Sequence, residues 1–135
     1  MYGCGTGWLE FASSEFESGL GKYVYKLDID YSKVLRISED GQLLKFTSEF
    51  KAPLRDYEKI FKGEGKRVSN IDWGKVASKY GGIEINPYIP GLRLDHRTSW
   101  YYGWDVASGC LWNQSALKKL ELFAAYDEKK DEYLF

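Results

Sequence analysis

The clearest hydrophobic pattern in the chain is an alternation with a period of two over residues 23–29. Tyrosine, leucine and isoleucine occupy every second position, and Lys26 and Asp28 fall on the opposite face. This pattern is typical of a half-buried strand, so we predict a strand at Tyr23–Ile29. A second, shorter strand is predicted at Val34–Ile37.

Helical patterns occupy the middle of the chain. Ser38–Gly41 opens the first predicted helix, which Pro53 ends or bends, and Leu54–Phe61 is expected to add another helical turn or two. The clearest helix follows Asp72, a good N-cap residue, and Gly81-Gly82 stops it. Its predicted inward stripe has helical spacing and consists of Trp73, Val76, Ala77 and Tyr80.

Short apolar runs predict further extended segments on both sides of these helices. A long loop is expected at Asn86–Ser99, a polar loop at Gly63–Lys66, a flexible start at residues 1–7 and a solvated, frayed tail at residues 127–135. The predicted strands are Trp8–Ser14, Gly82–Ile85, Trp100–Val106 and Gly109–Trp112, with a mainly extended edge segment at Ser115–Phe123.

This order of elements predicts an α+β fold. Strands open the chain, helices fill its middle and strands return, which favours two antiparallel or mixed sheets with the helices grouped on one side. The regular alternation of a doubly wound parallel sheet is missing. With 135 residues, the chain is expected to form a single domain at residues 1–135.

Composition narrows the classes of function. The net charge of −1 gives no basic field for nucleic acid, and no apolar run approaches the length of a membrane span. The start of the chain lacks the pattern of a signal peptide, so a cytoplasmic setting is the default expectation. Two cysteines and a single histidine, His96, predict no metal site and no disulfide framework.

The segment Trp100–Trp112 is the richest in aromatic residues and contains one acid, Asp105. Rings around a carboxylate would desolvate it, so a lone acid in such a stretch is a candidate catalytic group. The alternative is an ordinary core hairpin whose aspartate caps a turn. Cys110 follows in the same segment, where a buried inert thiol is favoured over a nucleophile.

Two further groups of residues are candidates for binding. Ser13 and Ser14 follow Phe11 and could hold a ribose or support an acid, although taken alone they are better explained as a serine N-cap for a short helix beginning near Glu15. The loop at Asn86–Ser99 carries cations that could meet an anionic ligand, or could be ordinary solvated charges. These cations are Arg93, His96 and Arg97.

The order of these pieces resembles the ADP-ribosyltransferase fold, and in particular small ADP-ribosylating anti-CRISPR proteins. The resemblance rests on the aromatic-then-hydroxyl motif at Phe11–Ser14, on Tyr25–Leu35 and Gly82–Ile85, and on an acid five residues before Cys110. It extends from Trp8 to Trp112. It implies a split sandwich of two sheets, NAD⁺ as the substrate held between them, and Asp105 as the catalytic acid.

Other roles follow from the same resemblance. Ser13 and Ser14 would contact the ribose or the acid, Tyr25 (or Tyr23) would stack on nicotinamide, and Trp100 and Trp104 would wall the site, together with Tyr102. The family also places an arginine or histidine on its first strand, and Met1–Gly7 has neither. Arg97, Arg93 or His96 would then supply the cation, or the domain has kept the fold and lost catalysis.

The resemblance predicts a mono-ADP-ribosyltransferase that modifies a macromolecular target with NAD⁺. The expected target is a protein, such as a component of a bacterial defence system opposed by a phage or mobile-element factor, and nucleic acid is left open as a target. The alternative is a catalytically inactive protein of the same fold that blocks a partner by binding. A small-ligand or nucleotide-binding domain without a transfer step is a third reading.

Overall fold

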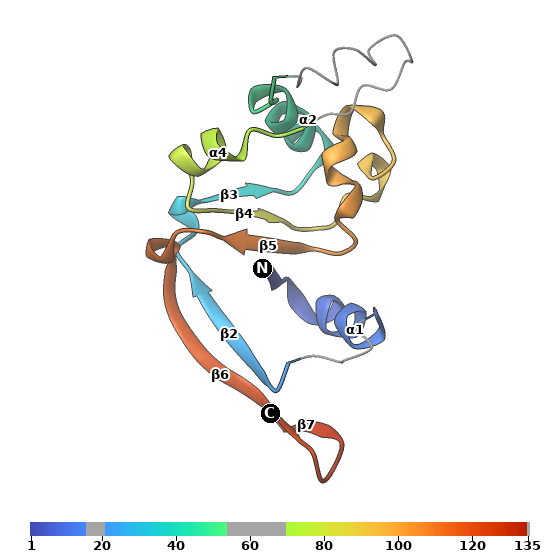
Figure 1. Ribbon diagram of the computed structural model, residues 1–135, viewed down its shortest axis with the longest axis vertical. Helices are drawn as coiled ribbons and strands as arrows, with labels where there is room; N and C mark the ends of the chain where they lie inside the picture. Colours follow the sequence, from blue (N-terminus) through green and yellow to red (C-terminus); the bar gives the residue numbers. More distant parts are fainter. Residues whose placement is uncertain (16–20, 54–69, 135) are drawn as a thin grey trace.

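The fold contains two separate β-sheets, as a computed structural model shows for residues 1–15, 21–53 and 70–134 (Figure 1). The predicted α+β fold with two sheets is confirmed. The larger sheet has the strand order β1-β5-β4-β3. Its strands are β1 (Tyr2–Gly3), β3 (Val34–Ile37), β4 (Gly82–Ile85) and β5 (Ser108–Leu111). β3 is parallel to β4, whereas β5 is antiparallel to both of its neighbours.

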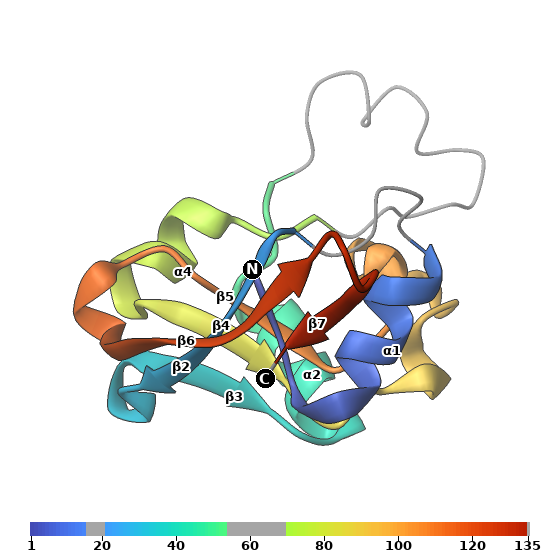
Figure 2. The same cartoon turned by 90° about the horizontal axis from the view of Figure 1, so that it is seen from below.

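Helices α2 (Asp40–Glu49) and α4 (Trp73–Lys79) and the 3-10 segment η4 (His96–Gly103) cover one face of this sheet. Because side chains alternate along a strand, Ile83 and Ile85 of β4 share this face and are fully buried there. They pack with Leu43 and Phe46 of α2 in the main core. Figure 2 views the molecule from below, with the second sheet in front and α2 behind.

The two central helices lie where the sequence predicts them. The carboxylate of Asp72 accepts a hydrogen bond from the backbone N–H of Lys75, which confirms the predicted N-cap of α4. Val76 is fully buried. Trp73, however, is 42% exposed, so the prediction that it points into the core is wrong. α4 has two turns, and its core face is correspondingly narrow.

The second sheet has the order β2-β6-β7 and forms an antiparallel ribbon. Its strands are β2 (Tyr23–Ile29), β6 (Leu117–Asp127) and β7 (Glu132–Leu134). Over residues 117–123 β6 is extended and pairs with β2 and no other described strand, so the predicted edge segment is confirmed there; only Ala125–Asp127 pair with β7. β7 also pairs with the end of β6, so the expected frayed tail is instead a hairpin. Figure 1 shows the distal half of the ribbon standing clear of the larger sheet.

The N-terminal predictions are wrong in two respects. Tyr2 and Gly3 form a strand rather than a flexible start, because they pair with Gly109 and Ser108 at the edge of the larger sheet. Residues 8–14 belong to helix α1 (Gly5–Glu15) rather than to a strand. Trp8, Phe11 and Ala12 are three and four positions apart, which is a helical period, and no alternation is present. α1 lies on the side of the larger sheet away from α2 (Figure 1).

The aromatic segment also differs from its predicted strand. Residues 96–103 form η4, and β5 begins only at Ser108. Within the expected loop at Asn86–Ser99, a 3-10 turn, η3 (Pro90–Leu92), comes before η4. Two further 3-10 turns, η1 (Tyr31–Lys33) and η5 (Gln114–Ala116), join the larger sheet to the ribbon.

Two predictions, the helical turns at Leu54–Phe61 and the loop at Gly63–Lys66, lie outside the described residues. Within the described ranges, no helix is long and apolar enough to span a bilayer.

Candidate functional site

Asp105 lies at the surface, between the end of η4 and the start of β5. Its side chain is 38% exposed, and its carboxylate forms an ion pair with the guanidinium of Arg93 at 2.5 Å. The expected enclosure by aromatic rings is therefore not found. An exposed carboxylate can be reached by a ligand, and its neighbour is a cation rather than a core side chain.

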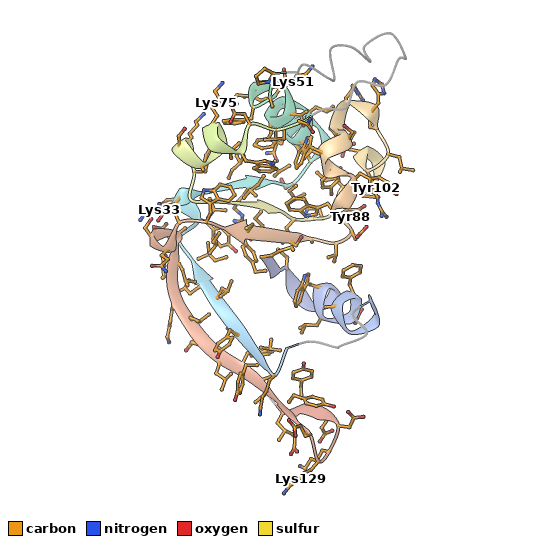
Figure 3. All side chains as sticks on the ribbon, viewed as in Figure 1. Lys33, Lys51, Lys75, Tyr88, Tyr102 and Lys129 are labelled. Carbon is orange, nitrogen blue, oxygen red and sulfur yellow. The ribbon has the colours of Figure 1, made fainter. Side chains whose placement is uncertain are left out.

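Arg93 also contacts Tyr102, which lies near the end of η4. Its Nε donates to the backbone oxygen of Tyr102 at 3.4 Å, and the guanidinium carbon lies 5.5 Å from the centre of the Tyr102 ring. Tyr102 is 59% exposed. Figure 3 shows Tyr102 at the end of the larger sheet opposite Lys33. We call Arg93, Tyr102 and Asp105 the Arg93–Asp105 site: a guanidinium, an open ring and an accessible carboxylate.

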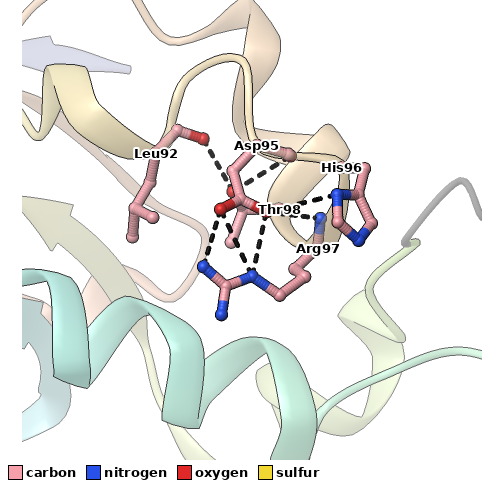
Figure 4. A network of polar contacts seen from close by, with 5 residues as sticks. All are labelled: Leu92, Asp95, His96, Arg97 and Thr98. Atoms are coloured by element: carbon pink, nitrogen blue, oxygen red, sulfur yellow. Dashed lines mark hydrogen bonds and ion pairs between the residues drawn. The ribbon is translucent and has the colours of Figure 1, made fainter.

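The other two cations of this loop have a different partner. Arg97 forms a two-pronged ion pair with Asp95, with its Nη2 2.7 Å from Asp95 Oδ2, and His96 Nδ1 lies 3.9 Å from the same carboxylate (Figure 4). These contacts with Arg97 lower the pKa of Asp95 to about 2. Of the three predicted cations, Arg93 is therefore the one placed beside Asp105.

Trp100 and Trp104 lie beside the site, but their rings pack into the main core. The indole N–H of Trp100 donates to Thr47 Oγ1 at 2.8 Å, and its ring meets the ring of Phe46 edge-on. The ring of Trp104 stacks on that of Tyr101 at 5.9 Å. Trp100 therefore packs in the core beneath α2. The aromatic side of the site, which Trp100 was expected to form, is formed by the exposed ring of Tyr102.

Two buried donors next to this site lack partners. Among the described residues, neither the indole N–H of Trp104 nor the hydroxyl of Tyr88 has a hydrogen-bond partner. An unpaired buried donor costs about 1–3 kcal/mol, and few such groups occur in a native structure. Trp104 directly precedes Asp105, so one of these donors is adjacent to the candidate acid.

The remaining predicted residues come from other parts of the fold. Ser13 and Ser14 belong to α1 rather than to a strand, and their side chains lie outside the described part of the structure. Tyr25 is on β2 in the ribbon, opposite Leu122. The described contacts do not link Tyr25 with Asp105, and Figure 1 shows β2 well separated from η4.

A buried carboxylate that the sequence analysis missed is found on the other face of the larger sheet. Glu84 on β4 has only 3% of its side chain exposed. Its Oε2 accepts hydrogen bonds from the hydroxyls of Tyr2 at 2.8 Å and Tyr31 at 3.2 Å. Its Oε1 faces Arg36, whose Nη2 is 3.2 Å away. The guanidinium of Arg36 in turn lies 4.0 Å from the centre of the Tyr31 ring.

The groups around Glu84 are held in their protonated forms. Burial and the nearby Glu84 carboxylate raise the pKa of the Tyr2 hydroxyl, and the same two causes raise the pKa of the Cys4 thiol to about 11. Glu84 thus accepts bonds on both oxygens and has a cation beside it. We interpret this cluster as a structural link between β1, β3, β4 and η1.

The signal for Glu84 was present in the sequence. It is the only charged residue of the segment GIEI, which forms β4. The rule that selected Asp105, a lone acid in an apolar segment, selects Glu84 as well.

The two cysteines, and side chains that could bind a metal, also lie in the described residues. Cys4 and Cys110 are both free thiols. Within the residues that the structure describes, no three histidine, cysteine, aspartate or glutamate side chains are grouped as metal ligands would be.

Comparisons with known proteins give no relative: no family model, no curated protein and no solved structure matches the chain.

Proposed function

We propose that the protein transfers ADP-ribose from NAD⁺ to a macromolecular target, using the Arg93–Asp105 site. The supporting observation is the ion pair between Arg93 and Asp105 beside the exposed ring of Tyr102. A guanidinium can bind a pyrophosphate, an open ring can stack on a base, and a carboxylate can face a ribose. The family resemblance of the sequence supplies the choice of NAD⁺, and the cytoplasmic setting is proposed because the start of the chain lacks a signal-peptide pattern.

Each residue has a defined task in this proposal. The Arg93 guanidinium binds the pyrophosphate, because it offers several donors in one plane and carries a fixed charge. The Tyr102 ring stacks on a base of the ligand. When the ligand takes over Arg93, the Asp105 carboxylate is left to face the ribose.

The chemical step breaks the bond between nicotinamide and the anomeric carbon of the ribose. Positive charge grows on that carbon as nicotinamide leaves with the bonding electron pair, and the negative charge of Asp105 stabilises it. An acceptor group on the target then forms the new bond to the same carbon and releases its proton. The step needs neither a metal nor a redox partner.

The position of Asp105 in the fold suits this role. The following residues lead directly into β5, which pairs with both β1 and β4. The backbone N–H of Cys4 donates to the carbonyl of Ala107 at 3.0 Å, which fixes the segment just after the acid. A carboxylate attached to a fixed sheet keeps its position when a ligand binds.

In the test, NAD⁺ that carries a label in the phosphate of its adenylate half is incubated with the protein and a bacterial lysate. We expect label to transfer to macromolecules with the wild type and to fall at least ~100-fold with Asp105→Ala. Glu128→Gln, which removes an exposed acid from the turn after β6, is the matched control and should retain transfer. Transfer that survives Asp105→Ala unchanged refutes the assigned role.

A second candidate function, a non-catalytic interaction protein, is favoured by the ribbon. Six of its large apolar residues are about half exposed, which suits an interface more than a free surface: Tyr23, Tyr25, Leu120, Leu122, Phe123 and Leu134. Calorimetry separates the two functions. Tight binding of a protein partner together with no detectable association with NAD⁺ would favour the interaction protein.

A further inference from the structure

Within the described part of the chain, β2 has an unpaired outer edge. β2 is the first strand of the order β2-β6-β7, and no described strand pairs with its other side. Every second residue of β2 therefore directs its backbone N–H and C=O toward a possible neighbour on this edge. Edges of this length are usually shortened, bulged or covered, because they otherwise pair with another strand.

The two faces of β2 have opposite character. Tyr25, Leu27 and Ile29 share one face with their β6 partners Leu122 and Leu120. This apolar face becomes buried toward the base of the ribbon, where Ile29 packs against the larger sheet, and it is exposed farther out. Any strand added to β2 must therefore be apolar at alternate positions.

The other face carries ordered charges. Lys26 lies opposite Glu121, and Asp28 lies opposite Lys119, so each cross-strand pair has opposite signs. Opposite charges facing each other across an antiparallel pair are stabilising, and like charges are destabilising. A strand added at the outer edge must present an acid to Lys26 and a base to Asp28.

We infer that this strand is β2 of a second copy of the chain, paired antiparallel with Leu27 opposite Leu27 on a twofold axis. In that register Lys26 faces Asp28 of the second copy, and Asp28 faces its Lys26. On the apolar face, Tyr25 lies opposite Ile29 of the second copy. The two ribbons then form one continuous six-stranded sheet, β7-β6-β2-β2-β6-β7.

The sequence of β2 selects this register over its neighbours. Moving the axis to either adjacent residue places Lys26 opposite Lys26, or Asp28 opposite Asp28. Shifting the pairing by a single position sets apolar side chains opposite charged ones, because the two faces alternate. Self-complementarity about a twofold axis is what a symmetric dimer requires.

Charge-swap variants test the pairing by analytical ultracentrifugation. Lys26→Asp places two acids face to face twice in the dimer, and Asp28→Lys places two lysines face to face twice. We expect each variant to raise the dimer dissociation constant at least ~10-fold. An equimolar mixture of the two variants should dimerise again, because every edge pair then has opposite signs.

Glu121→Lys is the matched control. It places a lysine opposite Lys26 inside the ribbon, just as Lys26→Asp places an acid opposite Glu121. The charges of β2 itself are unchanged. This variant should dimerise like the wild type, and circular dichroism establishes that each variant is folded. A wild type that stays monomeric up to ~100 µM, swaps that leave dimerisation unchanged, or a mixture that fails to associate would overturn the inference.

Discussion

The guanidinium of Arg93 and the carboxylate of Asp105 meet at 2.5 Å across the two ends of η4. This segment is anchored by buried side chains. Thr98 Oγ1 donates to the backbone oxygen of Leu92 at 2.7 Å, and the hydroxyl of Tyr101 accepts from the backbone N–H of Ile89 at 3.0 Å. Because both anchors are fully buried, the separation between the cation and the acid is set by the fold rather than by flexible side chains alone.

Removing the Arg93 guanidinium should weaken NAD⁺ binding. For Arg93→Ala we expect the dissociation constant to rise at least ~10-fold, because a charge-assisted contact to phosphate contributes about 1.5–3 kcal/mol. Arg97→Ala is the matched control, since its guanidinium is already paired with Asp95. Isothermal titration calorimetry measures both variants. Equal losses with the two arginines would contradict the special role of Arg93.

The aromatic cluster beneath α2 allows a comparison of two tryptophans. Trp73 is 42% exposed, whereas Trp100 packs among Phe46, Tyr101 and Trp104 and donates to Thr47. We expect Trp100→Ala to destabilise the fold by about 3–5 kcal/mol and Trp73→Ala by about 1–2 kcal/mol.

Urea unfolding, followed by circular dichroism, measures this difference as a shift of the midpoint at constant slope. Trp73→Phe, which keeps an aromatic ring against Trp100, should recover part of the smaller loss. If Trp73→Ala lowers the free energy of unfolding as much as Trp100→Ala does, then the partly exposed ring of Trp73 stabilises the fold more than its exposure indicates.

Elements with a clear period or a cap could be predicted from the sequence. Three predictions of this kind are confirmed: the strand at residues 23–29, the helix capped by Asp72, and the helix that ends before Pro53. Each depends only on residues a few positions apart in the sequence. The aromatic segment at residues 100–106 has no such signal, because rings are compatible with strands and with the turns of η4. Its geometry depends on hydrogen bonds to residues 89 and 92 in the preceding turn.

The candidate acids show the same limit. Asp105 and Glu84 are both single acids in apolar segments, and the sequence alone does not say which is buried. Glu84 is covered because Tyr2 and Tyr31 come from distant segments and because Gly109, opposite it on β5, leaves room for the ring of Tyr2. Asp105 follows η4 and remains at the surface. Burial here is decided by long-range pairing, which local patterns do not encode.

The Glu84 cluster should contribute strongly to stability. Glu84→Gln keeps the shape of the side chain but removes its charge, so it turns an amide toward donors and leaves Arg36 unpaired. We expect a loss of about 2–3 kcal/mol at neutral pH, less than for a fully buried pair because Arg36 is half exposed. Glu49→Gln, which breaks the exposed pair with Lys79, is the matched control and should cost less than about 0.5 kcal/mol. Equal losses would contradict the structural role of Glu84.

The Cys4 thiol should react only in strongly alkaline solution. Burial, followed by the Glu84 charge, raises its pKa to about 11, from an ordinary value near 9.0. The folded protein therefore holds this proton more tightly than the unfolded chain between about pH 9 and pH 11. The contribution of the thiol to stability is complete below that window and is lost as the pH rises through it.

A Cys110→Ser background leaves Cys4 as the only thiol, and the rate of iodoacetamide labelling then reports its ionisation. We expect the half-maximal rate near pH 11. In the same background Glu84→Gln should move this midpoint downward only in part, because burial is the larger cause of the raised pKa and persists without the carboxylate. A midpoint near pH 9 in the parent background would show that Cys4 is neither buried nor placed beside Glu84 as the structure has it.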